Sequence, residues 1–133
     1  MKTQMDADER RKQLNEVTEA IIGCCYKVAN TLGTGFLEKV YENALVHELT
    51  KAGRLVQQQV PIAVRYDDIV VGEYVADLLV VNAILVELKA ISFLEKVHSA
   101  QCMNYLRATE LSICLLVNFG RPRIQIERIV NNF

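Results

Sequence analysis

The sequence lacks the features that mark several protein classes. Its four cysteines include no C-x-x-C pair and no histidine-paired spacing of the kind that binds zinc. No stretch reaches the roughly 18 apolar residues that span a membrane. The charged N-terminus has no apolar signal core. We therefore expect a cytoplasmic protein with reduced thiols, in which the cysteines serve as small core residues.

A strong excess of one charge is also missing. The net charge is −1 and the pI is about 6.1, whereas a strongly basic nucleic-acid binder usually has a pI above about 9. This balance still allows an enzyme that meets nucleic acid through a small local patch. The 133 residues, of which 51% are hydrophobic and 23% charged, suit one globular domain over 1–133, with residues 1–10 frayed.

Apolar periodicity predicts the order of the secondary-structure elements. Apolar residues recur at helical spacing over 14–32, and Gly33 is a good helix stop. A second helix is expected over 36–52, with Thr34 as its cap, and a third over 94–109. Turn signals at 67–68 and 82–83 separate strand-like runs. The order α-α-β-β-β-α-β-β predicts a mixed α+β fold, with a central mixed sheet flanked by helices.

Acidic residues interrupt three apolar segments. Glu38 falls between Leu45 and Leu49 on the wheel of the second helix, where an acid is costly unless it is paired or metal-bound. Asp77 interrupts the apolar run YVADLLVV, and Glu87 interrupts ILVELKA. Lys89 shares the face of Glu87, because residues two apart on a strand point the same way. If the two strands pair in the right register, Asp77 and Glu87 form an oxygen site for a divalent cation.

Ordinary explanations exist for each of these residues. Glu38 can be a surface acid that reaches solvent, and Asp77 can cap a backbone group at a strand edge. Glu87 and Lys89 can form a solvated ion pair. On the third helix, Gln101 and Tyr105 share the stripe expected to face the sheet, where Tyr105 can be simply a core residue.

The combined pattern resembles a known superfamily. Asp77 followed by Glu87-Leu88-Lys89 is the D-x(n)-E-x-K signature of PD-(D/E)XK nucleases, and Gln101-x-x-x-Tyr105 matches their exonuclease-type branch. The stretch from Gly35 to Tyr41 reads G-x-x-E-x-x-Y and is similar to the small GxxExxY family in this superfamily. The resemblance covers about residues 14–130.

The resemblance implies a restriction-endonuclease-like core with Mg²⁺ or Mn²⁺ at Asp77 and Glu87. The backbone carbonyl of Leu88 would be a further ligand, and Glu38 would sit beside the metal, directly or through water. Lys89 would be the catalytic lysine. The substrate-binding or site-supporting residues would be Gln101, Tyr105 and Tyr41.

Two functional hypotheses follow. The first is a metal-dependent nuclease that hydrolyses phosphodiester bonds, with DNA the favoured partner. The second is a nuclease-like fold with little or no turnover that serves nucleic-acid binding or assembly. The near-neutral charge favours this second hypothesis. By analogy with small enzymes of this fold, a homodimer is compatible with either. A further alternative is that the acids form a structural polar cluster.

Overall fold

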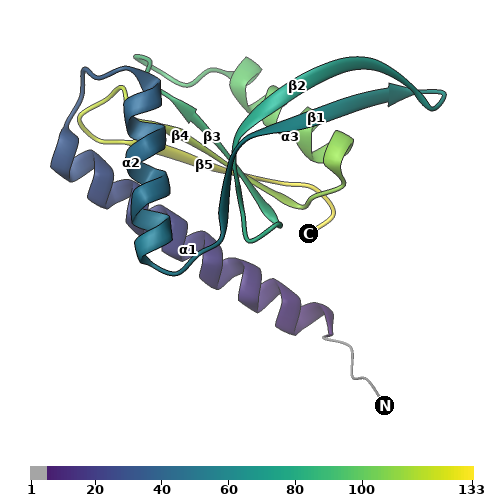
Figure 1. The fold of residues 1–133 in the computed structure, drawn as a ribbon, viewed down its shortest axis with the longest axis horizontal. Coiled ribbons are helices and arrows are strands. Elements are labelled where there is room, and N and C mark those ends of the chain that lie inside the picture. Colours follow the sequence, from purple (N-terminus) through teal and green to yellow (C-terminus); the bar gives the residue numbers. More distant parts are fainter. Residues whose placement is uncertain (1–5) are drawn as a thin grey trace.

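The computed structural model describes residues 6–133, and its element order is the predicted one. The three helices and five strands of the structure are α1 (Ala7–Leu32), α2 (Glu38–Lys51), β1 (Val56–Tyr66), β2 (Ile69–Val80), β3 (Ile84–Lys89), α3 (Lys96–Thr109), β4 (Ile113–Asn118) and β5 (Gln125–Val130). The predicted mixed α+β class is confirmed (Figure 1). None of the helices within residues 6–133 is both long and apolar enough to cross a bilayer.

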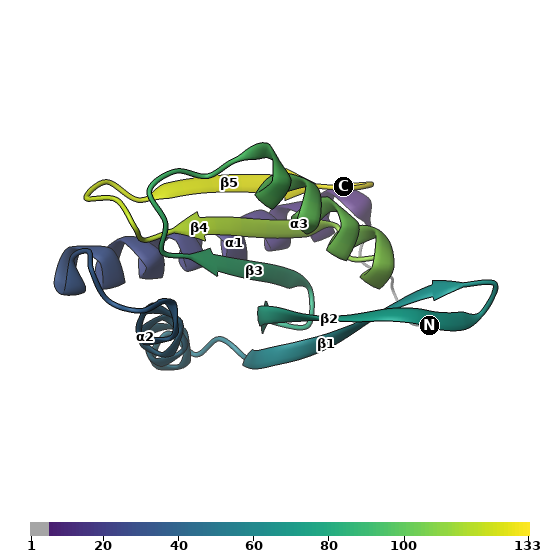
Figure 2. The same ribbon diagram turned by 90° about the horizontal axis from the view of Figure 1, so that it is seen from above.

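A single five-stranded sheet of order β1-β2-β3-β4-β5 organises the fold. All neighbouring strands run antiparallel except β3 and β4, which pair in parallel around the crossover through α3. The hairpin of β1 and β2 projects beyond the other three strands (Figure 2). The sheet therefore has a compact half, formed by β3 to β5, and an extended arm, formed by the hairpin of β1 and β2.

Alternation along β3 and β4 divides the core into two layers. Even-numbered residues of β3 and odd-numbered residues of β4 pack against α1 and α2, through side chains such as Ile21 and Leu45. The opposite face packs against α3, through Cys102 and Leu106. Because both faces are covered, five of the six residues of β3 are buried. Glu87 lies on the α3 face of this buried strand, two residues after Leu85.

The loop before α2 corrects the predicted start of that helix. The helix begins at Glu38 with Leu37 as its N-cap, so Thr34 lies three residues upstream of the cap. Positive φ angles at Gly33 (69°) and Gly35 (105°) shape this loop. As a result Leu37, which falls within the predicted helical range, precedes the helix and is 81% exposed.

The other boundaries differ less. Residues 7–10, expected to be frayed, belong to α1, whose Asp6 cap accepts a hydrogen bond from Glu9 N–H (2.8 Å); residues 1–5 lie outside the described part. Helix α3 begins at Lys96, two residues later than expected. The buried stripe of α3 runs through Cys102, Tyr105 and Leu106, whereas Val97 is 64% exposed.

Candidate active site at the split in the sheet

Asp77 and Glu87 lie where the arm leaves the compact half of the sheet, at the point between β2 and β3 that we call the split. Strand β2 pairs with β3 through Leu78↔Val86, Leu79↔Leu85 and Val80↔Ile84. The next position in this register sets Asp77 opposite Glu87, and there β2 turns away from β3. Directly opposed residues of antiparallel strands project to the same face. This register was left open by the sequence, since a slip of one residue would place Asp77 on the other face.

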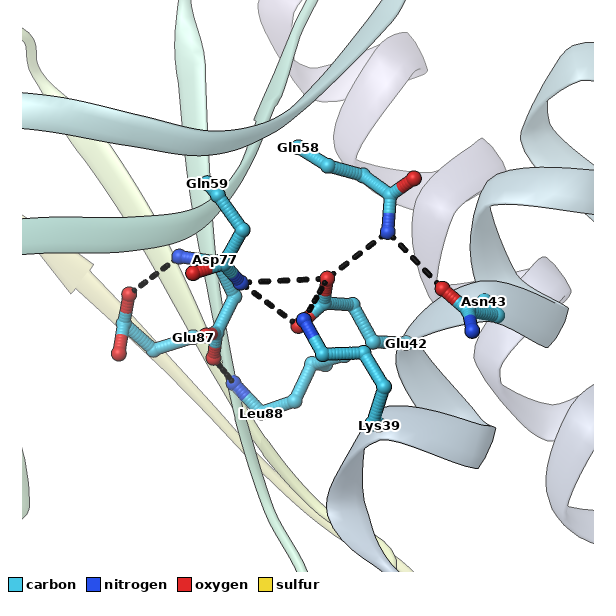
Figure 3. A network of polar contacts seen from close by, with 8 residues as sticks. All are labelled: Lys39, Glu42, Asn43, Gln58, Gln59, Asp77, Glu87 and Leu88. Carbon is cyan, nitrogen blue, oxygen red and sulfur yellow. Dashed lines mark hydrogen bonds and ion pairs between the residues drawn. The ribbon is translucent and has the colours of Figure 1, made fainter.

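The two carboxylates accept hydrogen bonds from backbone N–H groups of the facing strand. The N–H of Asp77 donates to Glu87 Oε1 (2.9 Å), and the N–H of Leu88 donates to Asp77 Oδ2 (2.8 Å) (Figure 3). A residue's N–H and C=O project to the same side of a strand. The carbonyl of Leu88 therefore faces the split together with both carboxylates.

Burial disfavours ionisation of both acids. Burial is the main cause that raises the pKa of Asp77, whereas the hydrogen bond from the Leu88 N–H and the side-chain amide of Gln59 lower it. Glu87 is 4% exposed; burial first, and then the neighbouring charge of Asp77, raise its pKa to about 8. Two poorly solvated carboxyl groups thus face each other across the split.

Lys89 and Glu38 complete the charged surroundings of this pair. The positive charge of Lys89 favours ionisation of both Asp77 and Glu87, and so partly opposes the rise in their pKa values that burial causes. Glu38, at the first position of α2, has an exposed side chain. Partial desolvation, followed by the charge of Asp77, raises the pKa of Glu38. Its carboxyl group therefore lies within electrostatic reach of the split.

The geometry brings two acids together rather than three. Within residues 6–133 no three His, Cys, Asp or Glu side chains are grouped as ligands of one ion. Asp77 and Glu87 face each other, whereas Glu38 approaches from α2. This arrangement fits a hard divalent cation such as Mg²⁺, which commonly takes one or two carboxylates and keeps several waters. A cation would also favour the charged forms of the two carboxyl groups, which burial disfavours.

A second buried acid, Glu42, was missed by the sequence reasoning. It is 2% exposed and accepts hydrogen bonds from Lys39 Nζ (2.9 Å), Gln58 Nε2 (2.8 Å) and Gln59 Nε2 (3.0 Å) (Figure 3). Its spacing of three from Leu45 would have placed it on the buried face. The sequence carried this signal, but the prediction singled out Glu38, whose side chain is exposed.

Gln59 connects the Glu42 cluster to the split. It stands in β1 opposite Asp77 and adopts a left-handed φ of 54°, between the ladder pairs Gln58↔Leu78 and Val60↔Ala76. A glutamine rarely adopts this conformation, which costs about 1–2 kcal/mol. The side-chain amide of Gln59 donates a hydrogen bond to Glu42 and also lowers the pKa of Asp77. The strained residue thus lies between a structural acid and a site acid.

Tyr41 supports the site from inside the core. It is 1% exposed, and its hydroxyl donates to Gly33 O (2.6 Å) and accepts from Phe36 N–H (3.3 Å). Its ring stacks on Phe119 at 4.8 Å. These contacts fix the loop that begins α2 and so position Glu38. Of the two roles considered for Tyr41, support fits its burial and substrate contact does not.

Helix α3 closes the other side of the split. Tyr105 is 5% exposed; burial, followed by the charges of Glu87 and Asp77, raises its pKa to about 12. Gln101 lies one turn earlier and is partly exposed. The Nδ1 atom of His98 accepts a hydrogen bond from Glu95 N–H (2.9 Å) as part of the capping box that begins α3.

The five-stranded mixed sheet with helices on both faces, and with two acids and a lysine at its split, is a restriction-endonuclease-like fold. The family model described as "PD-(D/E)XK nuclease superfamily" matches residues 15–129, so the chain belongs to this superfamily.

A solved structure agrees with this assignment at the level of fold. The chain is similar to an alkaline exonuclease from Laribacter hongkongensis, with a TM-score of 0.54 and 15% sequence identity. The match covers 98% of this chain and 73% of the exonuclease chain. A search of the curated proteins found no match.

Proposed function

We propose that this protein is a Mg²⁺- or Mn²⁺-dependent nuclease that hydrolyses phosphodiester bonds in DNA. The observation that carries the proposal is the opposition of Asp77 and Glu87 at the split in the sheet, with both pKa values raised by burial. Membership of the superfamily supports nuclease chemistry, and nucleases of this superfamily generally use divalent metals.

Asp77 and Glu87 would hold the cation, with the Leu88 carbonyl as a backbone ligand. The hydrogen bonds that tie Asp77 to Leu88 and Glu87 to Asp77 keep both carboxylates aimed at the split before any ligand arrives. Glu38 would bind at the periphery through water, because its exposed side chain approaches from α2. Such preorganisation reduces the reorganisation that binding and catalysis require.

When bound, the cation supplies a Lewis acid that polarises a phosphoryl oxygen and acidifies water. Lys89 would place its ammonium group beside the phosphate and stabilise the negative charge that develops on its oxygens. Glu38, whose pKa is raised by desolvation, would accept a proton from the attacking water. Gln101 and Tyr105 would hold the substrate at the α3 edge, and Tyr41 would keep Glu38 in place.

Three finer assignments belong to the same proposal. The G-x-x-E-x-x-Y stretch supports membership of the GxxExxY family, because Tyr41 anchors the loop that positions Glu38. Four free thiols, three of them buried, support a reducing compartment such as the cytoplasm. A homodimer would enlarge the substrate surface of a chain this small.

Cleavage and metal binding should be measured on matched variants. Asp77→Asn, Glu87→Gln and Lys89→Met should each lower Mg²⁺-dependent cleavage of DNA by about 10²-fold or more, with circular dichroism unchanged. Glu73→Gln alters an exposed acid of the arm and should cleave like the wild type. Equal cleavage by all four variants and the wild type would reject the proposal.

Calorimetric titration with Mn²⁺ separates this proposal from its alternative. Asp77→Asn and Glu87→Gln should weaken Mn²⁺ binding, whereas Lys89→Met should retain it, because the lysine serves the phosphate rather than the cation. Binding of Mn²⁺ by the wild type without cleavage of DNA or RNA would favour the nucleic-acid-binding or assembly module instead.

A further inference from the structure

A groove lies between the arm and α3, and two of the predicted site residues, Gln101 and Tyr105, line it. The two elements lie side by side (Figures 1 and 2), and the space between them has a volume of about 670 Å³. Pockets that hold small molecules span roughly 300–1,000 Å³. The polar and aromatic residues that line it are Arg65, Tyr74, Gln101, Asn104, Tyr105 and Arg107.

The charge of the groove differs from that of the whole chain. Arg65 projects from the arm and Arg107 from α3, so each wall carries one cation. Among the described residues that line the groove none is acidic, although the chain as a whole has a net charge of −1. Arg107 is held by a hydrogen bond from its Nη1 to Asn104 Oδ1 (3.3 Å). The groove is thus a local basic channel that suits a polyanion.

An exposed aromatic ring adds a surface for stacking. Tyr74 is 49% exposed, and its ring lies 5.8 Å from that of Tyr105 at an angle of 51°. Tyr105 is buried at the inner end of the groove, within electrostatic reach of Glu87 and Asp77. The groove therefore extends from an exposed ring to Tyr105, which packs in the same buried cluster as Ala76, the residue next to Asp77.

We propose that this groove binds an unpaired strand of nucleic acid and leads it to the acids at the split. The proposal rests on the nuclease function above and adds its substrate class. Basic channels lined with aromatic rings are typical of single-strand binding, because phosphates follow the cations while bases stack on the rings. The backbone would pass between Arg65 and Arg107, and a base would stack on Tyr74.

Fluorescence anisotropy with labelled oligonucleotides in EDTA tests the proposal without cleavage. An unpaired strand, and a duplex with an unpaired tail, should bind at least tenfold more tightly than a blunt duplex of the same sequence. DNA and RNA versions of the strand distinguish the two sources of this chemistry. Single strands that bind no better than the blunt duplex overturn the proposal.

Matched variants locate the binding surface. Tyr74→Ala should weaken single-strand binding on the order of tenfold, whereas Tyr66→Ala, on the same arm but outside the groove, should leave it unchanged. The double variant Arg65→Ala/Arg107→Ala should reduce the slope of log affinity against log salt by about 1.4, and Arg10→Ala on α1 should not. Unchanged binding in both groove variants overturns the proposal.

Two outcomes keep this proposal separate from the nuclease proposal. Groove-dependent binding of single strands without cleavage in Mg²⁺ or Mn²⁺ would sustain the groove and reject the nuclease. The opposite result would sustain the nuclease and reject the groove. In that case Tyr74→Ala and the arginine double variant would cleave a blunt duplex at wild-type rates, and neither would prefer unpaired strands. A dimer that dissociates in Tyr74→Ala would show that a second copy occupies the groove, which also rejects the proposal.

Discussion

Two buried acids on either side of Asp77 have very different surroundings. Glu42 is 2% exposed and receives hydrogen bonds from three side chains, one of them the ammonium group of Lys39. Glu87 is 4% exposed, and within residues 6–133 it receives one hydrogen bond, from the N–H of Asp77. The two side chains are therefore almost equally buried, but three residues donate hydrogen bonds to Glu42 and one donates to Glu87.

The difference separates a structural acid from the acid that we propose binds the cation. A buried carboxylate with several donors is compensated in the folded state and fixes the elements that supply those donors. Here Glu42 joins α2 to β1. A buried carboxylate with few donors opposes folding when it is charged, and a cation relieves that cost. Glu87 thus resists ionisation in the metal-free protein, and a bound cation would favour its charged form.

Replacing the two acids should change stability in opposite directions. Glu42→Ala should lower the free energy of unfolding by about 1–3 kcal/mol, because charged hydrogen bonds between α2 and β1 are lost. Glu87→Gln should raise it by about 1–3 kcal/mol at pH 7.5 in EDTA, because the neutral amide avoids the buried charge. Urea denaturation of both variants measures this contrast, and a loss of stability in both would refute it.

The pH dependence of the metal-free protein should show the same cost. The pKa of Glu87 is raised to about 8 in the folded state, while an unfolded glutamate titrates near 4.5, so between these values the folded state holds the extra proton. The free energy of unfolding should therefore fall as the pH rises from about 5 to 8. Asp77 and Glu38, whose pKa values are also raised, add to this trend.

Denaturation at pH 5, 6, 7 and 8 in EDTA should show the decline in the wild type and a shallower one in Glu87→Gln. Excess Mg²⁺ should restore most stability at pH 8, where the site is most ionised. Stability that rises over this range in EDTA, or equal slopes in the two proteins, would argue against a charged Glu87 as the source.

Much of the fold could be predicted because it depends on hydrophobic periodicity. The alternation that buries β3 on both faces, and the helical spacing of α1, are properties of local sequence. Gly33 and Gly53 end their helices at positive φ, as expected. Errors arose where a contact distant in sequence decides the conformation: Tyr41 fixes the loop before α2 and leaves Leu37 outside the helix.

The site could be predicted only in part, for the same reason. The residue types and spacing of Asp77, Glu87 and Lys89 were visible, but the register that opposes the two acids depends on where β2 leaves β3. The Glu42 cluster joins residues 15 to 17 positions apart, and the strain at Gln59 appears only in the backbone. Periodicity carries no information on either.

The link between the two acids can be tested at Gln59 with a smaller effect. Gln59→Gly accepts the left-handed φ without strain, so the strain it relieves should offset the lost hydrogen bonds and keep the free energy of unfolding within about 1 kcal/mol of the wild type. Mn²⁺ affinity, measured by calorimetry, should still fall severalfold, because Asp77 loses the side-chain amide that lowers its pKa. Gln58→Ala is the matched control: Gln58 bonds Glu42 and Asn43, so its loss should weaken the α2–β1 contact and spare Mn²⁺ affinity. Equal Mn²⁺ affinities in the two variants would mean that the Glu42 cluster supports the fold without positioning Asp77, and the two acids would then be independent.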